Sequence, residues 1–454
     1  QRQREKMGYR GGKGEESSEV HRDLKEAEFR QVLTPCRQAL IYFSIILLIA
    51  FGHLRDFVDG IFNLRIMLWR KIFKSFQGSS GCKEPAPTIS NDQDFYNRRL
   101  YQRIVDIFNR PICSAPGSWI DVVERARTSG SMSPLKHTGR LLRCMNLGSY
   151  NYLGFASHDP YCTPKVIETL KEYGVSACSS YADVGTTQKH VELEDTVAEF
   201  LGVESAFVYG MGFATNFNTI PILVGKNCLV LSDEFNHKSI VDGVKLSGAS
   251  VKVFKHNHMA HLEYLLRRCI VEGHPRTHRP WKKIFIIVEG IYSMEGEVVN
   301  LKEVVALKKK YKAYLYLDEA HSIGAMGGRG KGVCEHLGVD VSDIDIMMGT
   351  FTKSFGSCGG YIGGSRELVD YVRQCSPANY NATSISPSCA QQIISSIQVI
   401  SGHDGTQRGA DKIRGLRENS NFFRRELKAR GFQVLGDEDS PVVPIMSYYG
   451  GKIP

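Results

Sequence analysis

Residues 344–360 have the sequence IDIMMGTFTKSFGSCGG, an apolar run followed at once by a turn of glycines and hydroxyl residues that contains one lysine. The run Ile344 to Met348 is short and mostly apolar, which predicts a buried strand. Taken alone, Lys353 would be an ordinary surface lysine, because lysine is seldom buried without a partner. Whether Lys353 has a chemical role depends on which other residues lie at the same edge of the fold.

Three more apolar runs end in polar residues in the same way. They are Cys228 to Leu231 before SDEFNH (232–237), Ile284 to Val288 before EGIYS (289–293), and Tyr314 to Leu317 before DEAH (318–321). Such runs alternate with amphipathic stretches, among which we expect helices at Glu192–Leu201 and Leu301–Lys310. This alternation predicts an α/β fold with a largely parallel sheet. Since ligands bind outside the carboxyl ends of parallel strands, the four turns predict one site.

The residue types in these turns suit an aldehyde cofactor. Lys353 can form a Schiff base, and Asp318 at the end of an apolar strand can keep a pyridine nitrogen protonated, which makes the ring an electron sink. Each residue alone has a simpler explanation, since Asp318 could cap a helix and His237 could be a hydrogen-bonded polar neighbour. Their joint order along the chain predicts a pyridoxal phosphate site.

Two glycine-rich segments could bind anions. Residues 209–216, YGMGFATN, open a predicted helix whose free N–H groups suit the cofactor phosphate. Residues 327–332, GGRGKG, lack the Gly-Lys-Ser/Thr ending of a phosphate loop, so we expect a turn in which Arg329 and Lys331 could touch an anionic substrate.

Composition narrows the class of protein. The 454 residues are 42% hydrophobic, enough for a large core in two or three domains, and the net charge of +9 is modest and sits on no recognisable nucleic-acid module. The 12 cysteines contain no Cys-x-x-Cys pair, which indicates reduced thiols in a cytosolic compartment. His256, His258 and His261 are expected to be exposed loop histidines, and no metal site is expected.

The N-terminal part differs from the globular body. Residues 1–35 are predicted to be a flexible polar tail, and residues 79–145 a linker and an N-terminal arm. Between them, residues 36–78 join the apolar run Ala39 to Phe51 to a basic amphipathic stretch, which predicts helices that anchor the chain in a membrane. The alternative is a helical hairpin packed on a partner protein.

The body resembles the α-oxoamine synthases, pyridoxal phosphate enzymes that condense an amino acid with an acyl-CoA and release carbon dioxide. The most specific segments are GTFTKSFG (349–356), YLDEAHSIG (316–324), VEGIYSMEG (288–296) and NLGSYNYLGF (146–155). Over residues 94–444 the chain is most similar to the catalytic long-chain-base subunits, 2 or 3, of serine palmitoyltransferase. The resemblance implies a fold-type I, aspartate aminotransferase-like large domain at residues 146–386, and the start of a small C-terminal subdomain at residues 387–454.

The resemblance also implies roles for individual residues. Lys353 would hold the cofactor aldehyde and then act as the base at the substrate α-carbon, while Asp318 would pair with the pyridine nitrogen. His321 would contact the phenolic oxygen of the ring, and His237 would stack on the ring and seat the substrate carboxylate. Lys353 and His237 are thus the predicted catalytic residues. The other predicted contacts to the cofactor are Thr350, Gly212, Phe213, Glu289 and Ser293.

The activity implied is the condensation of L-serine with a long-chain acyl-CoA to 3-ketosphinganine, the first step of sphingolipid biosynthesis. The implied partners are a sister subunit without the lysine, whose cofactor phosphate Thr383 and Ser384 would reach, and small activating and regulatory membrane subunits. The implied location is the endoplasmic reticulum membrane, with the active site facing the cytosol.

Some features depart from the family pattern. Ser176 and Tyr181 stand where the family commonly has glycine and arginine. We expect the sequence to be a fragment that lacks most of the small subdomain, with its carboxylate-binding arginine, and to be inactive alone. One alternative is a synthase that uses glycine and a shorter acyl-CoA, which the apolar N-terminal run disfavours. The other is a non-catalytic scaffold, which has no chemical need for Lys353, Asp318, His321 and His237.

Overall fold

The computed structural model describes residues 35–76, 95, 109–127 and 135–446. The predicted tail up to residue 34, most of the predicted linker and residues 447–454 lie outside these ranges. The chain divides into two compact units, one of residues 1–19, 115–120 and 145–446, and the other of residues 20–114, 121–144 and 447–454.

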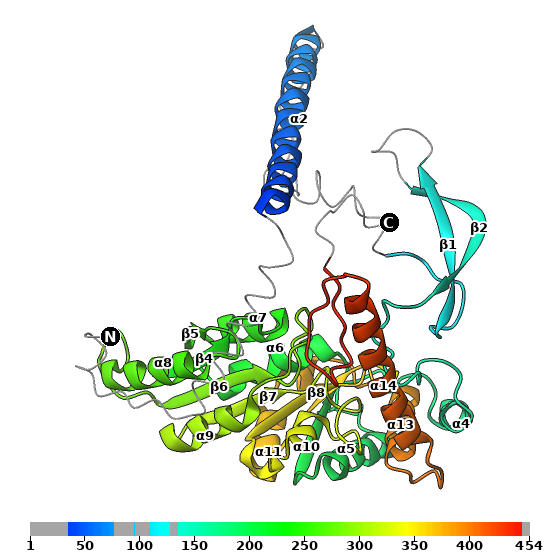
Figure 1. The fold of residues 1–454 in the computed structure, drawn as a ribbon, viewed down its shortest axis with the longest axis vertical. Helices are drawn as coiled ribbons and strands as arrows, with labels where there is room; N and C mark the ends of the chain where they lie inside the picture. Colours follow the sequence, from blue (N-terminus) through cyan, green and yellow to red (C-terminus); the bar gives the residue numbers. More distant parts are fainter. Residues whose placement is uncertain (1–34, 77–94, 96–108, 128–134, 447–454) are drawn as a thin grey trace. The chain divides into compact units, whose positions relative to one another are not determined.

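Helix α2 is one continuous helix, Pro35–Phe76, drawn in blue in Figure 1. The prediction of separate apolar and basic helices was therefore wrong. Pro35 opens the helix and no proline follows within it, and Gly52 and Gly60 each cost only about 1 kcal/mol, too little to end a helix of 42 residues. Its segment Gln38–Phe62 is long and apolar enough to cross a membrane by length and composition.

Strands β1, Trp119–Arg127, and β2, Leu135–Met145, form a two-stranded sheet in the region predicted as linker and arm. Arg143 on β2 donates to Asp121 on β1 at 2.9 Å. These strands were not predicted from the sequence, because they mix apolar and polar side chains without a clear alternation, and nearly all of these side chains are at least partly exposed.

The body is built on a seven-stranded sheet in the order β3-β9-β8-β7-β6-β4-β5. Only β9 runs antiparallel to its neighbours, β3 and β8, so the largely parallel sheet is confirmed. The strands are β3 Ser205–Tyr209, β4 Cys228–Asp233, β5 Ser250–Phe254, β6 Lys283–Glu289, β7 Tyr314–Asp318, β8 Ile346–Thr350 and β9 Gly360–Gly364. β8 begins two residues after the predicted Ile344, because the Asp345 carboxylate accepts a hydrogen bond from the backbone N–H of Leu315 at 2.7 Å.

Helices cover both faces of this sheet, with α6 and α7 on one face and α8 and α9 on the other (Figure 1). The helices are α4 Cys162–Tyr173, α5 Gln188–Leu201, α6 Gly212–Leu223, α7 Lys238–Ser247, α8 Met259–Glu272, α9 Leu301–Tyr311, α10 Gly332–Leu337, the 3-10 helix Val341–Asp343, α11 Arg366–Cys375, α12 Pro377–Asn381, α13 Pro387–Ile400 and α14 Arg408–Ala429. Both expected helices are confirmed. The first begins earlier than predicted, at Gln188, because Thr187 and His190 cap its N-terminus reciprocally.

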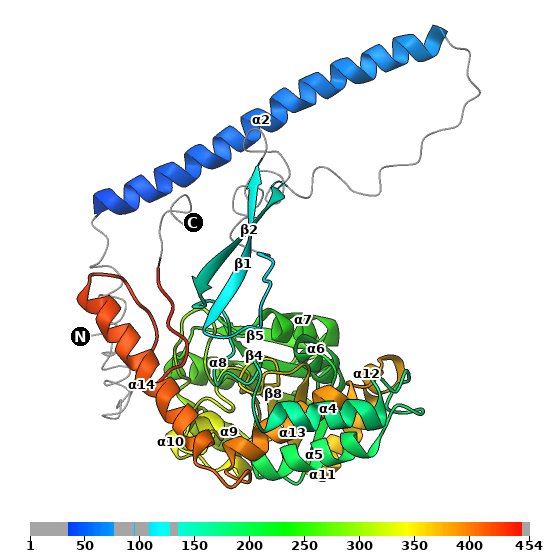
Figure 2. The same ribbon diagram turned by 90° about the vertical axis from the view of Figure 1, so that its right-hand side faces the viewer.

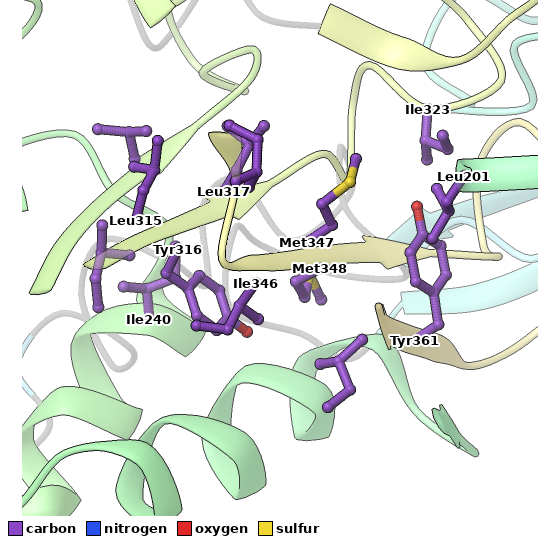
Figure 3. Close-up of a cluster of buried hydrophobic side chains, with 14 of the residues drawn as sticks. Leu201, Ile240, Leu315, Tyr316, Leu317, Ile323, Ile346, Met347, Met348 and Tyr361 are labelled. Atoms are coloured by element: carbon purple, nitrogen blue, oxygen red, sulfur yellow. The ribbon is translucent and has the colours of Figure 1, made fainter. Parts of the chain in front are cut away.

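The core lies between the sheet and its helices. Strands β7 and β8 present Leu315, Leu317 and Met347 to it, and all three are at most 1% exposed (Figure 3). Helix α13 packs against α4 and α5, as Figure 2 shows, and buries Ile393 and Ile394 in the same core. The core therefore continues past residue 386, where the sequence predicted the large domain to end.

Candidate active site

The turns that follow β4, β6, β7 and β8 meet around one cavity of about 260 Å³. The N-terminus of α6 also lines this cavity. The lining residues are Met211, Gly212, Phe213, Asn216, His237, Ser239, Glu289, Asp318, Ala320, His321, Met348, Thr350, Thr352 and Lys353. Of the predicted cofactor contacts, only Ser293 is absent from this lining.

Lys353 reaches the cavity from the turn directly after β8. Burial lowers the pKa of its amine below the ordinary value, and the nearby acidic groups, first Asp318 and then Glu289, oppose that change only in part. A lowered pKa raises the fraction of neutral amine, which is the form that attacks an aldehyde.

Asp318 is the last residue of β7 and is 3% exposed. Its Oδ1 accepts a hydrogen bond from the backbone N–H of Ala320 at 2.9 Å, and its Oδ2 accepts one from Asn216 Nδ2 at 2.8 Å. Two donors hold the carboxylate at the edge of the cavity, where it can face a cationic nitrogen.

The buried His321 and the partly buried Tyr152 form a pair, with 2.7 Å between Nδ1 and Oη. Burial, and after it the nearby Lys353 and His237, moves the pKa of His321 well below its ordinary value, which favours the neutral imidazole. Tyr152 lies in the segment NLGSYNYLGF that marked the resemblance, but nothing in the sequence distinguishes it from its neighbours as a site residue.

His237 caps helix α7, and its Nδ1 faces the backbone N–H and the hydroxyl of Ser239 at 3.2 and 2.7 Å. Burial lowers the pKa of this histidine, against the influence of the Asp318 carboxylate. Glu289, the last residue of β6, accepts a hydrogen bond from the His237 backbone N–H. Burial and the proximity of Asp318 raise the pKa of Glu289 well above its ordinary value, which favours the neutral acid.

The N-terminus of α6 and the end of β8 form a cradle with no room for another side chain. A Cβ added at Gly212 would lie 2.6 Å from Thr350 Oγ1. Thr350 Oγ1 itself donates to the Gly359 carbonyl at 2.9 Å and lies 2.9 Å from the hydroxyl of Thr352. Free N–H groups at the start of a helix beside two hydroxyls form a suitable site for a phosphate.

Several residues singled out in the sequence lie outside the cavity lining. The guanidinium of Arg329 forms an ion pair with Glu335 at 2.8 Å. Ser384 is buried and donates to the Gly185 carbonyl at 2.8 Å. Tyr181 packs edge-on against Phe207 in the core.

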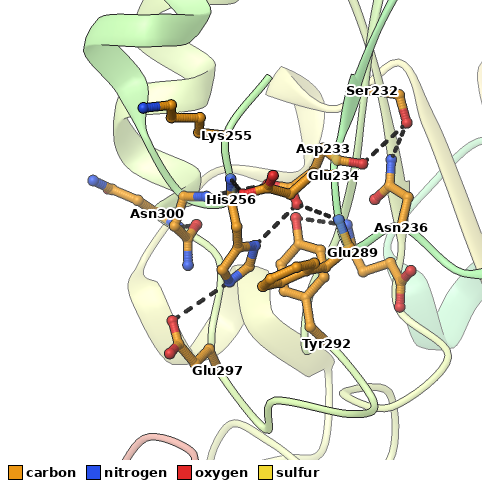
Figure 4. Close-up of polar contacts among 12 residues, drawn as sticks. Ser232, Asp233, Glu234, Asn236, Lys255, His256, Glu289, Tyr292, Glu297 and Asn300 are labelled. Carbon is orange, nitrogen blue, oxygen red and sulfur yellow. Dashed lines mark hydrogen bonds and ion pairs between the residues drawn. The ribbon is translucent and has the colours of Figure 1, made fainter. Parts of the chain in front are cut away.

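His256 contradicts the expectation of an exposed loop histidine. It is 8% exposed, and its two ring nitrogens lie 2.9 Å from Asp233 and 3.4 Å from Glu297 (Figure 4). Burial alone would lower its pKa, but the two carboxylates outweigh burial and raise the pKa to about 9. The sequence missed this site because both carboxylates are remote from His256 along the chain. Within the described ranges, no group of three or more His, Cys, Asp or Glu residues could hold a metal ion.

These residues fit pyridoxal phosphate. The cradle at Gly212 suits its phosphate, the carboxylate of Asp318 suits its pyridine nitrogen, and the amine of Lys353 suits its aldehyde. The family model for aminotransferase class I and II matches residues 143–449. The sheet, the cavity and this match define the chain as a fold-type I pyridoxal phosphate enzyme.

Relatives narrow the class further. Long chain base biosynthesis protein 2b of Arabidopsis thaliana is 59% identical over 413 residues, which cover 91% of this chain and 82% of the relative. Serine palmitoyltransferase 3 of Homo sapiens is 49% identical over 406 residues, covering 89% and 72%. The chain belongs to this serine palmitoyltransferase family, as the catalytic type of subunit of a pyridoxal phosphate-dependent acyltransferase.

Solved structures agree with this assignment. The serine palmitoyltransferase of Sphingomonas wittichii superimposes with a TM-score of 0.67 at 28% identity, covering 78% of this chain and 82% of that one. An SPT solved with the PLP internal aldimine gives a TM-score of 0.65 at 29% identity, with 78% and 82% covered.

Proposed function

We propose that this chain catalyses the decarboxylating condensation of L-serine with a long-chain acyl-CoA, which yields 3-ketosphinganine, CoA and carbon dioxide. The observation that carries the proposal is one cavity in which Lys353, with a lowered amine pKa, lies with the Asp318 carboxylate, His237 and the buried His321. High identity to long chain base biosynthesis proteins supports the choice of substrates.

Each residue has a defined task in this proposal. Bound pyridoxal phosphate supplies an electron sink for the negative charge left at the serine α-carbon. Lys353 holds the cofactor through its amine and later removes the α-proton. Asp318 keeps a proton on the pyridine nitrogen, and His321 holds the phenolic oxygen. His237 stacks on the ring and seats the serine carboxylate.

The remaining predicted contacts complete the binding of the cofactor. Thr350 and the backbone N–H groups of Gly212 and Phe213 would bind the phosphate. Glu289 and Ser293 would shape the pocket. Neutral Glu289 beside Asp318 avoids placing two negative charges at one end of the cavity, which supports its presence there.

Partners and location extend the proposal. The chain would pair with a sister subunit that lacks the lysine and would take small activating and regulatory membrane subunits. Of the two residues predicted to reach the phosphate of the neighbouring subunit, the exposed Thr383 keeps that role, whereas the buried Ser384 hydroxyl already donates to the Gly185 carbonyl. Segment Gln38–Phe62 would anchor it in the endoplasmic reticulum membrane, with the cavity facing the cytosol. Attachment to a membrane suits a product with a long alkyl chain.

The test is substrate-dependent product formation by the full-length protein purified with its partner subunit. Wild type should form the long-chain ketone from L-serine and palmitoyl-CoA, whereas Lys353→Ala should fall to background. Lys302→Ala, which changes an exposed lysine on α9, is the matched control and should keep full activity. Activity with glycine in place of serine would assign the chain to the alternative synthases, and full activity of Lys353→Ala would refute the catalytic role.

A further inference from the structure

A buried network of hydrogen bonds links Asp318 to His237. Asn216 Nδ2 donates to Asp318 Oδ2 at 2.8 Å and to Ser239 Oγ at 2.9 Å. Tyr316 Oη donates to Asn216 Oδ1 at 2.6 Å. Asn216, Ser239 and Tyr316 are each 1% exposed, so no bulk water competes for these bonds. None of the three was predicted from the sequence to have a role of its own.

The partners fix the orientation of the Asn216 amide. Its Oδ1 can only accept, so the hydroxyl of Tyr316 must be the donor in that bond. Its Nδ2 can only donate, and a carboxylate of Asp318 can only accept. A flipped amide would place its oxygen against the carboxylate, which the low polarity of the surroundings makes costly.

The orientation of the amide determines what Ser239 does. Because Ser239 Oγ accepts from Asn216, its own proton is free to point to His237 Nδ1, 2.7 Å away. The backbone N–H of Ser239 also points to this nitrogen, at 3.2 Å. A backbone N–H cannot reverse its role, so Nδ1 must carry a lone pair, and the proton of the neutral ring lies on Nε2.

We propose that Asn216 and Ser239 are positioning residues that hold His237 as its Nε2–H tautomer and connect it to the Asp318 carboxylate. The inference rests on the proposed role of His237 at the serine carboxylate. A ring fixed with its proton on Nε2 presents one donor to the cavity, which suits a carboxylate. The same network holds Asp318, so the groups assigned to the pyridine nitrogen and to the amino acid are aligned together.

The first experiment compares variants of the full-length protein in complex with its partner subunit. Ser239→Ala should keep its bound cofactor and keep kcat within about threefold, while KM for L-serine rises about tenfold, the cost of weakening one charge-assisted hydrogen bond. Ser239→Thr, which retains the hydroxyl, should restore most of the affinity. Ser247→Ala, at the far end of the same helix, is the matched control and should behave as wild type.

Two further measurements do not depend on turnover. Calorimetric titration with L-serine in the absence of acyl-CoA should show the same tenfold loss of affinity in Ser239→Ala. Nitrogen-15 histidine spectra of the cofactor-free protein, with the His237 signal assigned by difference from His237→Asn, should show an unprotonated Nδ1 in wild type. In Ser239→Ala only the longer backbone bond of 3.2 Å is left to hold the tautomer, so Nδ1 should become partly protonated there, and likewise in Asn216→Leu, where the Ser239 hydroxyl loses its donor.

The outcomes separate the two proposals. A protonated Nδ1 in wild type would overturn the inference, as would an unchanged affinity for serine in Ser239→Ala. If Ser239→Ala and Ser239→Thr lost the cofactor equally, Ser239 would act only through packing, and the inference would be overturned as well. If wild type itself neither binds nor consumes serine, the proposed function fails, while the nitrogen spectra still test the tautomer.

Discussion

The ion pairs of His256 predict a measurable dependence of stability on pH. Its pKa is raised to about 9 in the folded chain, against about 6.5 in an unfolded one. A raised pKa means that the stabilisation is complete below pH 6.5 and is lost as the pH rises through 9. The difference of about 2.5 units corresponds to roughly 3 kcal/mol. At pH 7.5 about 2 kcal/mol of this remains.

The charged and titratable groups around His256 determine which pH range is informative. Asp233 and Glu297 lie against its ring nitrogens, Glu295 is close enough to influence it, and the ring of Tyr292 lies 4.3 Å from it. Burial raises the pKa of Tyr292 well above its ordinary value. Between pH 6.5 and pH 10, therefore, we expect His256 to be the member of this cluster that titrates.

The assay is thermal unfolding of wild type and His256→Gln between pH 6 and pH 10. At about 1 °C per kcal/mol for a protein of this size, the difference between the two melting temperatures should shrink by roughly 3 °C over this range. The exposed His137 provides the matched control, His137→Gln, which should follow wild type at every pH. A constant difference between wild type and His256→Gln would show that the buried histidine is uncharged and would refute the reasoning.

Three further substitutions test the cavity. Gly212→Ala should lower the affinity for pyridoxal phosphate about tenfold, measured by cofactor titration, because its Cβ would crowd Thr350 Oγ1 at 2.6 Å and overpacking costs about 1–3 kcal/mol. Tyr152→Phe leaves His321 Nδ1 without its partner and should lower the free energy of unfolding by about 1–3 kcal/mol, measured by denaturant titration. Glu289→Gln should keep kcat within about threefold at neutral pH, since an amide resembles the protonated acid and a carbonyl still accepts from the His237 backbone N–H. An undiminished cofactor affinity in Gly212→Ala would contradict the first expectation, and an unchanged stability in Tyr152→Phe would contradict the second. An inactive Glu289→Gln enzyme would contradict the third.

The sequence predicted the strands that carry the site because buried parallel strands have a strong local signature. Runs such as Ile284 to Val288 are apolar without alternation, and a polar burst marks where each one ends. Lys353 and Asp318 could be chosen because their chemistry is unusual beside such runs. The same logic fails for β1 and β2, which mix apolar and polar residues without a comparable pattern.

The residues that were missed act through contacts remote in sequence. Asn216 is 102 positions from Asp318 and 100 from Tyr316, and the residues next to it along the chain do not indicate either contact. His256 was misjudged for the same reason, since Asp233 lies 23 positions away on another strand. A polar segment predicts exposed side chains only when no oppositely charged residue from elsewhere in the fold forms an ion pair with it.

Register explains why the scattered residues form one site. Glu289 pairs with Asp318 across β6 and β7, and Asp318 pairs with Met348 across β7 and β8, so these three residues stand in one row at the carboxyl edge of the sheet. A slip of one residue between β6 and β7 would turn Glu289 to the opposite face. The row also places Asp318 within reach of α6, from which Asn216 extends to it. Strand pairing therefore determines where the residues of the site lie. The polar turns supply the chemical groups at those positions.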